Sequence, residues 1–140
     1  MDPFSLALGG ITVCQVASKI IQFGISYAQS IQDLPADVQA LVSEITVLKA
    51  VLAEVCSHLQ DGSNGSSINA DLLEAPIMEC KEQIEELHAF LEKSQGSGSR
   101  LRNLRKTLKW PMKEQDTRDW INRMERYKSI FMLALTQVGL

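Results

Sequence analysis

Apolar residues recur along this chain at the spacing of α-helices, and strand signals are weak throughout. In the segments 36–60, 70–94 and 114–138 the apolar positions follow one another at steps of three and four. The three stripes are Leu41, Ile45, Leu48, Leu52, Val55 and Leu59; Leu73, Ile77, Cys80, Ile84, Leu87 and Leu91; and Trp120, Met124, Tyr127, Phe131, Leu135 and Val138. Such a stripe is the buried face of an amphipathic helix, so the pattern predicts three helices that share a core.

The first predicted helix covers residues 3–32 and differs from the others, because Lys19 is its one charged residue. Asp2 is a good N-cap and Pro3 suits the first helical position. Glycines at positions 9, 10 and 24 either bend this helix or allow another backbone to come close. The helix is apolar on more than one side, so it packs centrally or keeps a second face for another partner.

The segments between the helices are short and rich in turn residues. Residues 33–35 predict a turn, 61–67 a loop and 95–99 a flexible connection. A short basic helix is expected at 100–109, ended by Trp110-Pro111. Pro76 predicts a kink or a late start in the third helix.

Short connections favour antiparallel neighbours. The prediction is therefore an all-α protein: one domain, residues 1–140, folded as an antiparallel helical bundle of four long helices plus the short basic helix. The residues expected in its core are Leu41, Ile45, Leu48, Leu52, Ile84, Leu87, Leu91, Trp120, Tyr127 and Phe131.

The first helix is long enough to cross a membrane, for which about 20 apolar residues are needed. Its apolar side chains contribute about −5 kcal/mol to insertion, and Lys19 costs up to about 3 kcal/mol. Polar and glycine residues bring the sum near zero, which predicts conditional rather than constitutive insertion. The residues of this candidate membrane-insertion helix are Phe4, Leu6, Leu8, Ile11, Val13, Val16, Ile20 and Phe23. The segment lacks the positive start and the cleavage site of a signal peptide, so a cytosolic chain is expected.

Charge is distributed unevenly along the chain. Residues 1–99 carry 13 acidic and 4 basic side chains, whereas residues 100–140 carry 4 acidic and 10 basic ones. The basic patch consists of Arg100, Arg102, Arg105, Lys106, Lys109 and Lys113. Three uses are open for it: pairing with the acidic third helix, contact with anionic lipid headgroups, or nucleic-acid binding. The last is the least favoured, because only Trp110 is interleaved with the basic residues.

Enzymatic chemistry is not indicated by any motif. Glu85 and His88 have the spacing of half a di-iron site, but the second half is missing. Two isolated histidines make no zinc site, and Gly9-Gly10 lacks the remainder of a phosphate loop. Three cysteines form no CxxC pair and are expected to be reduced and buried. We therefore expect no catalytic residue, cofactor, metal or small-molecule substrate.

Several segments resemble the fungal HeLo-like (HELL) domain, the N-terminal domain of many STAND or NOD-like receptors. They are the opening Met1-Asp2-Pro3-Phe4-Ser5, the run 16–21, the turn 33–38 and the late segments 108–114 and 123–129. The resemblance covers nearly the whole chain apart from the Gly/Ser loops.

This resemblance implies the N-terminal cell-death effector of a larger protein, followed there by nucleotide-binding and repeat domains. Such a domain is cytoplasmic at rest. On activation it clusters with itself, reaches anionic lipids of the plasma membrane and damages the membrane through its first helix. The alternative is a non-lytic interaction module that recruits a like domain and never touches lipid.

Overall fold

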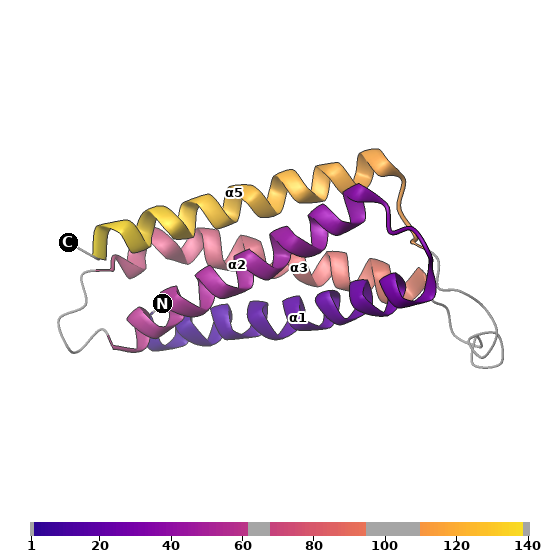
Figure 1. Cartoon of the computed structure of the whole chain (residues 1–140). Coiled ribbons are helices and arrows are strands. Elements are labelled where there is room, and N and C mark those ends of the chain that lie inside the picture. The colour runs from indigo at the N-terminus through magenta and orange to yellow at the C-terminus, as the bar shows by residue number, and fades with distance from the viewer. Residues whose placement is uncertain (1, 62–67, 95–109, 139–140) are drawn as a thin grey trace.

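The structure is a computed structural model and describes residues 2–61, 68–94 and 110–138. This part of the chain contains four long helices and no strand. The helices are α1 (Pro3–Ser30), α2 (Ala36–Gln60), α3 (Ala70–Ser94) and α5 (Glu114–Val138). They run alongside one another in an elongated bundle (Figure 1). The predicted all-α helical bundle is thus confirmed, whereas the predicted basic helix at 100–109 lies outside the described residues.

Local sequence signals account for the helix ends. Asp2 caps α1, because its Oδ1 accepts a hydrogen bond of 2.8 Å from the Ser5 amide. Asn69 does the same for α3, where its side-chain oxygen lies 3.1 Å from the Asp71 amide. Helix α1 ends at Ser30, two residues earlier than predicted, and α3 passes through Pro76 without the predicted late start.

The packing order of the helices is not the order of the sequence. Helix α1 packs against both α2 and α3, and α2 packs against α5, while α3 and α5 contact each other only sparsely. Helices α2 and α3 follow one another in the chain, yet they lie across the bundle from each other. The prediction of antiparallel neighbours is therefore correct for α1 with α2, but wrong for α2 with α3. The described chain begins and ends at the same end of the bundle (Figure 1).

The core is formed by the predicted stripes of α2 and α3 and by the middle of the α5 stripe, whereas Leu135 and Val138 are only partly buried. Every stripe residue of α2 and α3 is buried, and α5 adds Met124, Tyr127 and Phe131. Trp120, which was expected in the core, is only half-buried and lies against its edge. Its position at the sparse contact between α3 and α5 explains this difference, because among the described residues few of α3 reach α5 there.

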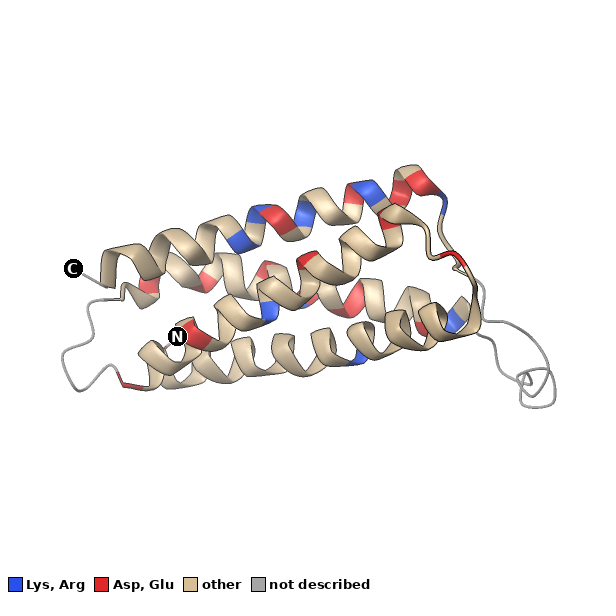
Figure 2. Ribbon diagram, in the orientation of Figure 1, with Lys and Arg blue, Asp and Glu red and all other residues tan. Residues whose placement is uncertain are grey.

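Charged side chains concentrate on part of the bundle surface. Figure 2 shows acidic residues along α3, residues of both signs along α5, and a ribbon almost free of charge for α1. Helix α1 thus differs from the other helices in carrying almost no charge on its surface.

Candidate membrane-active helix

Helix α1 is the candidate functional element. Within the described residues it is the one helix that is long and apolar enough to cross a membrane, and the core helix of a soluble protein meets the same criterion. Its surroundings in the bundle therefore decide what it can do.

The eight residues of the candidate insertion helix divide into three groups. Leu6, Val13 and Ile20 are fully buried against the other helices. Ile11, Val16 and Phe23 are partly buried and pack at the edge of the core. Phe4 and Leu8 are 61% and 49% exposed at the N-terminal end of the helix. Helix α1 is thus docked in the bundle and keeps an apolar N-terminal tip in solvent.

Two glycines allow α1 to lie close to α2. A Cβ atom at Gly10 would overlap the sulfur of Cys56, and one at Gly24 would overlap a methyl group of Val42. At Gly9 the nearest atoms belong to α3 and lie 3.7 Å away, an ordinary contact distance. The atoms that come close to Gly10 and Gly24 are thus side-chain atoms of α2 rather than its backbone, and Gly9 makes only ordinary contacts.

Two of the three thiols lie at the contact between α1 and α2. The Sγ atom of Cys56 is 3.5 Å from the carbonyl oxygen of Ala7, and the Sγ atom of Cys14 is 3.6 Å from that of Lys49. All three cysteines are free. Burial raises the pKa of Cys56 and of Cys80 to about 12, so both thiols stay protonated and unreactive at neutral pH.

Trp110 joins the C-terminal half of α1 to the start of α5. Its ring centroid lies 5.9 Å from that of Phe23 and 5.5 Å from that of Tyr27, both in tilted arrangements. Its indole nitrogen donates a hydrogen bond of 3.0 Å to the hydroxyl of Thr117, which is fully buried. The sequence placed Trp110 at the helix stop Trp110-Pro111 and among the basic residues, but not in the core, because it belongs to no apolar stripe.

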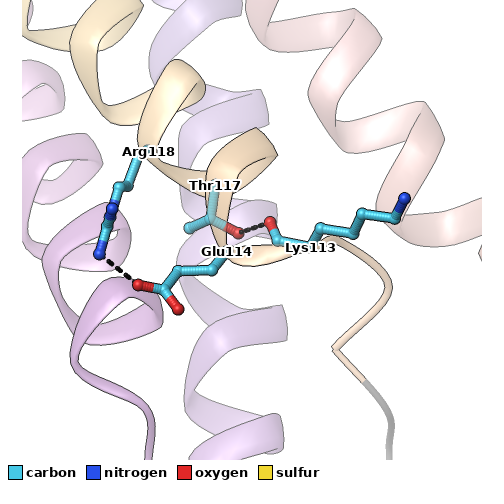
Figure 3. A network of polar contacts seen from close by, with 4 residues as sticks. All are labelled: Lys113, Glu114, Thr117 and Arg118. Atoms are coloured by element: carbon cyan, nitrogen blue, oxygen red, sulfur yellow. Dashed lines mark hydrogen bonds and ion pairs between the residues drawn. The ribbon is translucent and has the colours of Figure 1, made fainter.

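The first turn of α5 supports this contact. The carbonyl oxygen of Lys113 accepts hydrogen bonds from the amide and the hydroxyl of Thr117, at 3.0 and 3.2 Å. Figure 3 shows this turn, with the ion pair of Glu114 and Arg118 beside it and the Lys113 ammonium directed away. The buried threonine is therefore held in the orientation that receives the indole.

Ion pairs do not contribute to the docking of α1 among the described residues. In the described ranges, no ion pair includes a residue of α1. The hydroxyls of Thr12 and Ser18 donate to the carbonyls of Leu8 and Cys14 within the same helix, at 3.1 and 3.0 Å. Helix α1 consequently satisfies these groups by itself, as a helix in lipid must.

The other candidate groups do not form a second site. Glu85 pairs with Lys81 and His88 with Glu92, so the ExxH residues turn to different partners along α3. No cluster of three potential metal ligands occurs among the residues that the structure describes. Of the basic patch, only Lys113 belongs to the described residues, and it is exposed.

Comparison with known proteins relates the chain to one family. The family described as pigment biosynthesis cluster protein PigL N-terminal matches residues 1–140, the whole chain. No curated protein and no solved structure matches it. The chain therefore belongs to the family of PigL N-terminal domains.

Proposed function

We propose that this domain is a membrane-targeting cell-death effector of the HeLo-like type, in which α1 leaves the bundle after oligomerisation and enters anionic membranes. In this proposal the domain is cytoplasmic at rest and acts at the plasma membrane. Its partners are further copies of itself, anionic lipids, and the nucleotide-binding and repeat domains of a NOD-like receptor chain.

The observation that carries the proposal is the way in which α1 is held. The helix is apolar and long enough to span a membrane, and apolar contacts dock it without an ion pair in the described residues. Lipid can replace apolar contacts at little cost, whereas it cannot replace a salt bridge. The exposed Phe4 and Leu8 supply a first contact with the bilayer interface.

In this proposal oligomerisation is needed because release of α1 from the bundle costs free energy. Burial of Leu6, Val13 and Ile20 stabilises the docked state by about 1.5–3 kcal/mol for each side chain. Because the insertion energy of a single helix is near zero, one copy alone stays docked. Clustering raises the effective concentration of helices and basic residues at the membrane, which shifts the balance towards insertion.

Leakage of dye from vesicles tests the proposal. The purified domain, clustered through a fused oligomerisation module, is mixed with vesicles with and without anionic lipid, and both co-sedimentation and leakage are measured. We expect leakage that requires anionic lipid and is lost in the Leu8→Glu variant. The matched control is Leu72→Glu on α3, which also replaces an exposed leucine and should still leak. If the folded Leu8→Glu variant leaks as the native domain does, the proposal fails.

A reversible cross-link tests release itself. A Lys49→Cys variant places a second thiol on α2 next to the half-buried Cys14 of α1, whose Sγ atom lies 3.6 Å from the Lys49 carbonyl oxygen, so that oxidation joins α1 to α2. We expect the oxidised protein not to leak vesicles and the reduced protein to recover leakage. Equal leakage before and after reduction, with the disulfide verified by mass spectrometry, would rule out release of α1.

The second candidate function is a non-lytic interaction module. It is favoured by the apolar tip of α1, which is exposed while the helix remains docked and is available to a second copy. This alternative predicts concentration-dependent self-association that Phe4→Glu abolishes, together with no binding to vesicles of any composition.

A further inference from the structure

The sparse contact between α3 and α5 leaves a hollow that the proposed function does not use. Its volume is about 260 Å³, and we call it the α3–α5 hollow. Its apolar lining comes from Phe90, Met112 and Trp120, and its acidic lining from Glu86, Asp116 and Asp119. Phe90 is 48% exposed, so a large aromatic side chain faces solvent there.

Within the described residues, the acidic side chains of the hollow have few charged partners. Arg123 is the basic residue among its described lining, and it is engaged elsewhere: its guanidinium lies 4.4 Å from the centroid of the Trp120 ring and donates a hydrogen bond of 3.1 Å to Gln83. No ion pair of Glu86 or Asp116 occurs in the described ranges. An occupant that carries several cations and an apolar face would complement this surface.

We propose that the α3–α5 hollow binds the chain's own basic segment, residues 100–109. The segment contains Arg100, Arg102, Arg105, Lys106 and Lys109 and no acidic residue. Its leucines stand at 101, 104 and 108, at steps of three and four, so one helical face can present all three to the apolar lining.

The position of the segment in the chain supports this choice over any separate partner. The described part of the chain stops at Ser94, one helical turn after Phe90. It resumes at Trp110, two residues before Met112. Both residues line the hollow. A segment tethered at both ends beside a site has a high effective concentration there, so weak contacts suffice to hold it.

Docking of this segment has a consequence for the membrane function proposed above, and that consequence rests on that function. The same cations cannot face Glu86 and Asp119 and lipid phosphates at once. An anionic membrane therefore competes with the hollow, and the basic segment becomes available to lipid when it leaves the bundle.

Hydrogen–deuterium exchange tests the docking in the absence of lipid. We expect amides 100–109 of the monomeric domain to exchange about tenfold more slowly than their intrinsic rates. The reason is that several solvent-exposed ion pairs, each weak by itself, would hold the segment together. The Glu86→Gln/Asp119→Asn variant should lose this protection, and so should the native domain in high salt. The matched control, Glu82→Gln/Glu125→Gln, removes one exposed carboxylate from each of the same helices outside the hollow and should keep it.

Three results would overturn the proposal. The first is exchange of the native segment at its intrinsic rates. The second is protection that survives in the Glu86→Gln/Asp119→Asn variant while the melting temperature of that variant is unchanged. The third is protection that increases with protein concentration, which would assign the hollow to a second copy. None of these results depends on vesicle leakage, so this proposal and the membrane function can fail separately.

Discussion

Adding one methyl group at each of two adjacent glycines of α1 should change the stability of the bundle in opposite directions. In the Gly10→Ala variant the new Cβ overlaps the sulfur of Cys56. This sulfur has little room to move, because Cys56 is 4% exposed and its sulfur lies 3.5 Å from the carbonyl of Ala7. In the Gly9→Ala variant the new Cβ makes only ordinary contacts at 3.7 Å with Ile77 and Met78.

The magnitudes follow from two opposing effects. Replacing a helical glycine by alanine stabilises a helix by about 1 kcal/mol. Overpacking a dense core costs about 1–3 kcal/mol. Gly9→Ala should therefore raise the free energy of unfolding by about 0.5–1 kcal/mol, and Gly10→Ala should lower it by about 1–2 kcal/mol. For a domain of this size, 1 kcal/mol corresponds to about 3 °C in melting temperature.

Urea denaturation at constant m-value measures both changes, and a double-mutant cycle locates the cause. In the Cys56→Ala background the sulfur is absent, so Gly10→Ala should become neutral or stabilising there. If Gly10→Ala and Gly9→Ala shift the midpoint equally in the native background, close packing of α1 on α2 at Gly10 is refuted.

Three further predictions concern the remaining contacts. Thr117→Val leaves the Trp110 indole without its acceptor and should cost about 1–2 kcal/mol, whereas Thr136→Val, at an exposed position of the same helix, should change the denaturation midpoint little. The ammonium of Lys128 on α5 and the carboxylate of Glu44 on α2 are 2.7 Å apart and mostly buried. Lys128→Ala leaves this carboxylate unpaired and should lower the free energy of unfolding by about 1–3 kcal/mol. Arg118→Ala breaks an exposed pair and should lower it by under about 1 kcal/mol in the same assay. Burial raises the pKa of Cys56 and Cys80 to about 12, so above pH 9 the unfolded chain ionises these thiols while the folded chain keeps them protonated. The free energy of unfolding should therefore be unaffected by these thiols below pH 9 and fall between about pH 9 and 12. A Cys80→Ala variant measured over that range should show a shallower fall.

Much of the fold was predictable because helix formation and amphipathicity are local. A residue's place on the buried face depends on neighbours three and four positions away, so every stripe residue predicted in α2 and α3 is buried; Val38 and Cys56 of α2 are buried outside the stripe. The N-cap at Asp2 and the bounds of three helices follow from signals of the same short range.

The candidate site was predictable only in part. The unusual composition of the first helix singled it out from the sequence, since a single charge in so long a segment is evident without a structure. Which of its residues are docked depends on where α2 and α3 lie, and spacing does not specify this. Leu6 and Leu8 look alike in the sequence, yet one is fully buried and the other half exposed.

What the sequence determined by itself is therefore the set of helices, their apolar faces and the exceptional character of α1. Only the tertiary structure decided that α2 and α3 lie across the bundle from each other, and that Gly10 and Gly24 rather than Gly9 admit α2. It also decided that Trp110, outside every stripe, packs on α1, while Trp120, inside one, lies at the edge. The physical reason is that helix pairing depends on how whole side-chain surfaces fit across long sequence separations, and a periodic pattern carries no information about which surfaces meet.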